Sequence, residues 1–184
     1  ISKIENKNNN MNSLSDLIMA EHSRHQADFI VDIVLSQPSY LDELLHIVFQ
    51  NREPISRRAS WPLRIISERD INILESHVPV IIKRLPEIDN VAIQRAFLAI
   101  LVNVKIPKEN YGELLQFTCE ILLNPGSPVA SLIYSTDIFY KISINEPELL
   151  NELKLMLEQL LPYGSAGVKS KCRKTIKKID RLNQ

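Results

Sequence analysis

Apolar residues recur at intervals of three and four positions along almost the whole chain from residue 12 onward, which is the spacing of one face of an α-helix. The alternation of apolar and polar positions that marks a half-buried strand is absent from the sequence. Five of the ten prolines stand where a periodic segment begins, because a missing amide hydrogen costs little in the first turn of a helix. The pattern therefore predicts helices near residues 12–22, 24–36, 39–51, 54–68, 73–85, 89–104, 108–123, 127–144, 146–161 and 166–182.

The predicted helices repeat with a period of about 37 residues. The first helices of successive pairs share an apolar position, with offsets of 37, 36 and 39, at Leu41, Val78, Leu114 and Leu153. The second helices share another, with offsets of 37, 39 and 37, at Leu63, Ile100, Phe139 and Ile176. One turn before that position stand small residues, as close helix packing requires, at Ala59, Ala96, Ser135 and Cys172. Two separate helix series with one period indicate a stack of helical hairpins, none of which buries its apolar face alone.

The repeated segments resemble the HEAT/armadillo-like superfamily of α-helical repeats over about residues 38–182, with 12–36 as a degenerate first hairpin. The best match is the second helix at 89–101, where an acidic residue in the turn is followed by a basic residue, a small one and then aliphatics. The resemblance implies an all-α fold, a right-handed superhelical solenoid of about four to five antiparallel hairpins. We expect a single domain over 12–184, with hairpins near 12–36, 39–68, 73–104, 108–144 and 146–182. Residues 1–11 are interpreted as a disordered tail or the remnant of a leader.

Basic residues occupy equivalent positions in three of the second helices, at Arg58, Arg95 and Lys171, whereas the third repeat has Tyr134 there. In HEAT-like proteins such basic residues commonly pair with acids in the turns of neighbouring repeats. The resemblance therefore implies a structural role for these three cations.

Composition and charge narrow the class of protein. The chain has 184 residues and a formal net charge of zero, with 45% apolar and 24% charged residues, which is ordinary for a globular domain. Its two cysteines, Cys119 and Cys172, form neither a metal-binding spacing nor a disulfide framework. No apolar run is long enough for a membrane span. We expect a soluble protein of the cytoplasm, and its frequent Asn, Lys and Ile are compatible with an AT-rich bacterial genome.

The search for catalytic or metal-binding motifs yields little. The segment 164–170 mimics a phosphate-binding loop, but it is one residue too short and follows a helix rather than a strand. His22 and His25 could face one metal ion on a helix, yet no further Cys or His cluster supplies the remaining ligands. We therefore expect no catalytic residue, no metal and no cofactor, and interpret the protein as one without enzymatic activity.

The only Trp of the chain stands between two arginines. On a helical wheel the segment 55–68 has its apolar face at Ile55, Ala59, Pro62, Leu63 and Ile66. Arg57, Trp61 and Arg64 fall on the opposite side, as does Glu68. Aromatic and Arg side chains dominate the energetics of protein interfaces, so this cluster is a candidate recognition surface. The alternative is that Trp61 packs against the next repeat, and Pro62 weakens the wheel argument because proline kinks helices.

Charge is distributed unevenly along the chain. Residues 165–184 hold seven basic residues and one acid, a net charge of +6, so the other 164 residues carry −6. The segment keeps one apolar stripe and is predicted to be a docked amphipathic helix with a cationic outer face. Such a face can be the polar cap that a terminal repeat needs for solubility. It can also bind an acidic protein or the phosphates of a nucleic acid.

These observations favour a protein-interaction scaffold that uses the concave face of a short helical array. In HEAT-like arrays the second helices line that face, which here means about 54–68, 89–104, 127–144 and 166–182. The candidate binding residues are Arg57, Trp61, Arg64, Gln94, Arg95 and Lys171. The expected partner is a protein or peptide, with no membrane involved and the oligomeric state left open. The alternative is a DNA-binding protein similar to the HEAT-like glycosylases of alkylation repair, which the zero net charge disfavours.

Overall fold

The computed structural model describes residues 13–182, which are almost entirely helical. The α-helices are α1 (Leu14–Ala20), α2 (Arg24–Ser36), α3 (Ser39–Phe49), α4 (Ile55–Arg69), α5 (Val78–Arg84), α6 (Val91–Asn103), α7 (Tyr111–Leu122), α8 (Val129–Ser143), α9 (Leu149–Leu160) and α10 (Ala166–Leu182). Three short 3₁₀ helices join them, η1 (Ile71–His77), η2 (Leu85–Glu87) and η3 (Lys108–Asn110). Within 13–182 there is no strand, and the predicted all-α fold is confirmed. The predicted tail at 1–11 lies outside the described residues.

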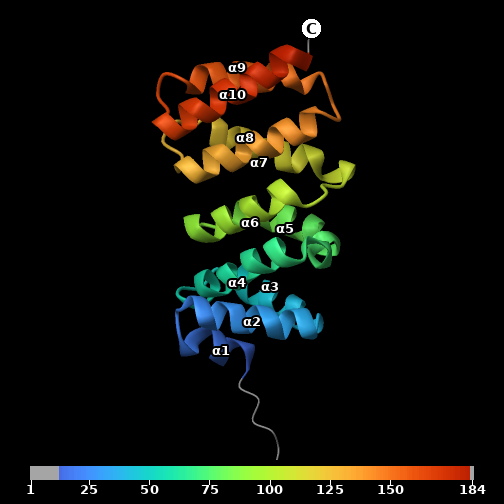
Figure 1. Ribbon diagram of the computed structural model, residues 1–184, viewed down its shortest axis with the longest axis vertical. Helices are drawn as coiled ribbons and strands as arrows, with labels where there is room; N and C mark the ends of the chain where they lie inside the picture. The colour runs from blue at the N-terminus through green and yellow to red at the C-terminus, as the bar shows by residue number, and fades with distance from the viewer. Residues whose placement is uncertain (1–12, 183–184) are drawn as a thin grey trace, which may run out of the picture.

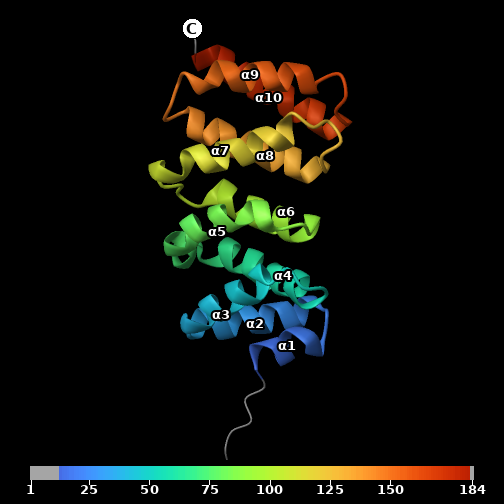
Figure 2. The same cartoon turned by 180° about the vertical axis from the view of Figure 1, so that it is seen from behind.

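The helices stack in order from α1 at one end of an elongated molecule to α10 at the other (Figure 1). The helices form two rows, one in front of the other. In the view from behind, the order along the stack is the same and the other row faces the viewer (Figure 2). In one row α4 contacts α2 and α6, α6 contacts α8, and α8 contacts α10. We call α4, α6, α8 and α10 the inner row; its helices contact one another more extensively than α5, α7 and α9 do. Stacked helical hairpins of this kind form a solenoid.

The first helix of the middle hairpin differs from the regular helix predicted at 73–85. The chain there runs through the 3₁₀ turns of η1, a short α5 and the 3₁₀ turn η2. The side chain of Asp70 accepts a hydrogen bond from the backbone N–H of Asn72, which starts η1. Pro79 stands in the first turn of α5, and Pro86 lies in η2, two residues after the last residue of α5. A proline cannot donate a backbone hydrogen bond, so the α-helix is confined to the few residues between these two positions.

The small residues of the second helices lie at the contacts between repeats. Ala59, Ser135 and Cys172 are at most 1% exposed, and Ala96 is 6% exposed. Larger apolar residues fill the remaining space, and Phe97 of α6 stacks on Phe49 of α3 with ring centroids 5.4 Å apart. Packing between neighbouring hairpins therefore buries the apolar faces that no hairpin can bury alone.

Basic side chains close the C-terminal ends of helices in other hairpins. Arg58 of α4 donates from Nη1 to the carbonyl oxygen of Met19 at 3.1 Å, near the end of α1. Lys141 of α8 donates from Nζ to the carbonyl oxygens of Leu101, Val102 and Val104, at the end of α6. The last carbonyls of a helix have no partner within it and carry partial negative charge, so cations are favoured there. These bonds fix the register of one hairpin on the next.

Candidate functional site

A groove with a volume of about 560 Å³ opens between α4, α6 and α8 of the inner row. Its lining residues come from these three helices and from the α1–α2 turn: His22, Arg57, Ser60, Trp61, Arg64, Ala92, Arg95, Ala96, Ala130 and Tyr134. The volume is in the range of sites that hold small molecules or a few side chains of a partner. The groove thus collects aromatic and basic side chains from four consecutive repeats.

The groove is hollow because small residues lie where the helices approach one another. Ala92 and Ala96 of α6, Ala130 of α8 and Ser60 of α4 contribute little more than methyl or hydroxymethyl groups. The hydroxyl of Ser60 donates to the carbonyl oxygen of Arg57 at 2.8 Å, so its own polar group is satisfied within α4. These small side chains therefore leave the space that forms the groove.

Trp61 is half-buried and serves the core and the groove at once. It packs against the main hydrophobic core and also lines the groove. The ring of His22 meets its indole edge to face, with the two centroids 5.6 Å apart. The following Pro62 is buried within α4, which continues through it to Arg69. The two alternatives for Trp61, packing between repeats and forming a surface, are thus both part of its environment.

Two of the three arginines in the groove already have carboxylate partners. Arg57 pairs with Glu53, in the turn before α4, at 3.0 Å, and Arg64 pairs with Glu68, one turn further along α4, at 2.8 Å. Arg95 is exposed, and within residues 13–182 no hydrogen bond, ion pair or ring contact engages its guanidinium. Exposed pairs of this kind contribute only about 0–1 kcal/mol each to stability, so they can open for a ligand. Arg95 can bind a ligand without first breaking an ion pair.

The sequence matches the family of HEAT repeat domains over residues 14–179. The chain belongs to this family. The resemblance seen in the repeated segments is therefore confirmed, and the HEAT repeats extend through the hairpin of α1 and α2. No curated protein and no solved structure matches the chain.

Of the six residues predicted as a binding surface of this HEAT repeat domain, four line one groove: Arg57, Trp61, Arg64 and Arg95. The other two lie elsewhere. The side-chain amide of Gln94 donates to the carbonyl oxygen of Ile88 at 2.5 Å, in the turn before α6. Lys171 of α10 pairs with Asp137 of α8, outside the groove.

Arg58 and Lys171 make contacts between repeats, as the expected structural role requires, although neither pairs with an acid in a turn. Arg58 bonds to a backbone carbonyl, and Arg95 has no partner in the described part of the chain. Lys171 does contact an acid, but Asp137 lies within α8 rather than in a turn. Neighbouring HEAT repeats are joined here by cations on helix ends, by apolar packing and by ion pairs such as that of Arg69 with Asp28.

Two aromatic residues of the groove were not among the predicted binding residues. Tyr134 occupies the repeat position of Arg95 and lines the same groove one helix further along the inner row. The alignment of the repeats contained this signal, since Tyr134 was the one departure from a basic residue. His22 comes from the turn after α1, where no periodic pattern applies.

The described residues offer little reactive chemistry. Among residues 13–182 there is no group of three His, Cys, Asp or Glu side chains placed to hold a metal ion. Burial raises the pKa of the Cys119 and Cys172 thiols, so neither is an activated nucleophile. Ser76, His77 and Asp42 form a hydrogen-bonded chain, but Ser76 and Asp42 are exposed and none of the three lines the groove. In the part of the chain that the structure describes, no helix has the length and apolar character to cross a membrane.

Proposed function

We propose that this HEAT repeat domain is a non-enzymatic protein-interaction module that holds a peptide segment of its partner in the groove. The observation that carries the proposal is the grouping of Trp61, Tyr134 and Arg95 in one groove, where Arg95 has no partner among residues 13–182. Aromatic and Arg side chains near the centre of a pocket are the residues that carry most binding energy at protein interfaces. A partner segment with one acidic and one apolar or aromatic side chain would satisfy all three.

The charges of the groove favour a peptide over a nucleic acid. Glu53 and Glu68 neutralise Arg57 and Arg64, which leaves Arg95 as the one arginine of the groove without a carboxylate partner in the described residues. Affinity for a phosphate backbone grows with the number of cations that contact it, so a single free cation supplies little. A peptide carboxylate, in contrast, needs only one guanidinium for a charge-assisted bond.

Replacing Trp61 and Arg95 together with alanine is expected to weaken binding of the natural partner at least about 30-fold, because a pair of central anchors contributes 2 kcal/mol or more. Partners are recovered from an extract of the source cells with the immobilised full chain and then titrated as purified proteins. Trp61 is the only Trp, so a shift of its emission on binding reports directly on the groove.

The matched control is Leu155→Ala with Lys105→Ala, which removes one apolar and one basic exposed side chain away from the groove. It is expected to leave binding unchanged. Equal binding by the Trp61/Arg95 variant and the wild type, with native circular dichroism, would place the interaction elsewhere. Binding of duplex DNA that requires Arg57 and Arg95 would support the nucleic-acid alternative for the groove.

A further inference from the structure

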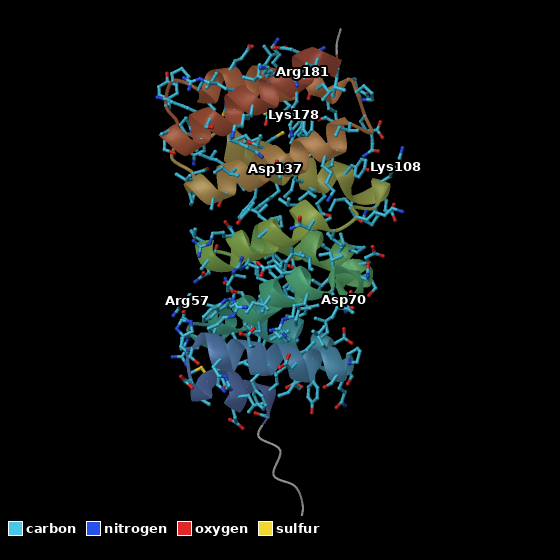
Figure 3. The ribbon with its side chains drawn as sticks, in the orientation of Figure 1. Arg57, Asp70, Lys108, Asp137, Lys178 and Arg181 are labelled. Atoms are coloured by element: carbon cyan, nitrogen blue, oxygen red, sulfur yellow. The ribbon has the colours of Figure 1, made fainter. Side chains whose placement is uncertain are left out.

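The outer face of α10 carries a dense row of cations. Val168, Cys172, Thr175 and Ile179 form the buried stripe of this helix. The opposite face is exposed and basic, with Arg173, Lys174, Lys177, Lys178 and Arg181. Figure 3 shows Lys178 and Arg181 on α10, at the end of the stack furthest from α1.

The acids near α10 do not neutralise this face. Asp180 is held by Lys154 of α9 at 2.7 Å, and Asp137 of α8 is held by Lys171. Lys178 lies over the ring of Tyr140, 5.5 Å from its centroid, which orients the ammonium without cancelling its charge. Within residues 13–182 none of the five outer cations pairs with a carboxylate. Solubility alone does not require a face on which five cations all lack a carboxylate partner.

The density of these charges matches that of a nucleic-acid duplex. The five cations span eight residue steps of a helix, roughly 12 Å at 1.5 Å per residue, so neighbouring charges stand ~3 Å apart along its axis. Along one strand of a duplex the phosphates stand ~3.4 Å apart, whereas the side chains of an extended acidic peptide alternate between two sides, so the carboxylates that face one surface stand ~6.6 Å apart. We propose that the outer face of α10 binds the phosphate backbone of duplex nucleic acid. Contacts of this kind read no base sequence.

The rest of the molecule does not prevent this contact. The first repeats are acidic, with six Asp or Glu and one Arg over residues 13–50. They lie at the opposite end of the stack (Figure 1), and even α3 is roughly 30 Å from α10, since three steps of about 10 Å lead from α4 through α6 and α8 to α10. The Debye length is about 8 Å at physiological salt, so their repulsion of the duplex is screened. At low salt the same asymmetry turns the basic end toward a polyanion.

The test is fluorescence anisotropy of a fluorescein-labelled 20-base-pair DNA duplex titrated with the full chain at 50–200 mM KCl. Five phosphate contacts predict a slope of about −4.5 in log K against log salt, and therefore about a 500-fold loss of affinity across this range. Lys177→Gln with Arg181→Gln is expected to reduce the slope by about 2 and the loss to about 40-fold. Both side chains are exposed, and circular dichroism checks that the variant folds.

The matched control is Lys83→Gln with Lys105→Gln, which removes two exposed cations away from α10 and should leave the slope unchanged. Emission of Trp61, which lies on α4, should not shift on duplex binding, and Trp61→Ala should bind the duplex like the wild type. The proposal thus stands or falls independently of the groove. It is overturned if no binding occurs at 50 mM KCl, or if the control pair weakens binding as much as the α10 pair. Equal competition by poly-L-glutamate or by phosphatidylserine vesicles at matched charge would also overturn it, in favour of another polyanion.

Discussion

Replacing Phe97 with alanine is expected to lower the free energy of unfolding by about 3–5 kcal/mol, the usual cost of truncating a fully buried aromatic residue. Phe97 of α6 has no exposed surface, and its ring stacks on that of Phe49 of α3 at a centroid distance of 5.4 Å. Because the pair joins two hairpins, the cavity would lie at a junction between repeats. The measurement is urea denaturation of the wild type and the variant.

The junction also predicts a loss of cooperativity. Each repeat of a solenoid contacts only its neighbours, so a weakened junction in the middle of the stack lets the two halves unfold separately. Trp61 emission reports on α4, whereas circular dichroism reports on all helices. The urea transitions seen by these two probes should coincide in the wild type and separate in Phe97→Ala. Phe29→Ala is the matched control, since Phe29 is 47% exposed and its truncation should change stability by no more than about 0.5 kcal/mol. A single coincident transition at wild-type stability in Phe97→Ala would contradict this account.

The helical architecture could be predicted from the sequence because the same pattern of apolar residues recurs in each repeat. A period of about 37 residues in two helix series leaves few folds that bury every apolar face. The exception, η1 and α5, shows the limit of periodicity. The positions of the apolar residues at 73–85 fit an α-helix, but Pro79 and Pro86 confine it to Val78–Arg84.

The groove could be predicted in part. A helical wheel needs only one helix, and it placed Arg57, Trp61 and Arg64 on one side of the segment that became α4. Repeat equivalence is weaker, because a groove lies between helices and uses different sides of each. Gln94 precedes Arg95 by one residue, about 100° around α6, and that rotation turns it to the carbonyl of Ile88 instead of the groove. His22 reaches Trp61 from a turn, and only the folded chain brings the two together.

Lys141 shows a further property that the sequence does not reveal. The sequence pattern shows Lys141 only as a basic residue near the end of a predicted helix. In the structure, Nζ donates to the carbonyl oxygens of Leu101 at 3.1 Å and of Val102 at 2.9 Å, and also to that of Val104. Burial lowers the pKa of this ammonium from 10.5 to about 8. The side chain thus satisfies the end of α6 at the cost of burying a charge.

The difference in the free energy of unfolding between the wild type and Lys141→Met is expected to widen as the pH rises from 8 to 10.5. Between these values the unfolded chain keeps the proton on Lys141 that the folded chain has released, so the unfolded state binds more protons and stability rises with pH. The neutral amine still donates two hydrogen bonds, whereas methionine donates none. Buried acceptors left without a donor cost about 1–3 kcal/mol, which should appear in full near pH 10.

At pH 7 Lys141 is protonated in both the folded and the unfolded wild type. The cost of desolvating the buried charge then offsets part of what the hydrogen bonds of Lys141 contribute. The difference in the free energy of unfolding between the wild type and Lys141→Met is therefore expected to be smaller at pH 7. Urea denaturation at pH 7, 8, 9 and 10 measures it, and the ionisation of tyrosines cancels because both proteins contain them. Lys105→Met is the matched control, because Lys105 is exposed and should show no such trend. A difference that stays constant, or narrows, with rising pH would mean that the ammonium keeps its ordinary pKa at the end of α6. The three carbonyls would then compensate its burial completely, and Lys141 would act as a permanent charge on the helix terminus.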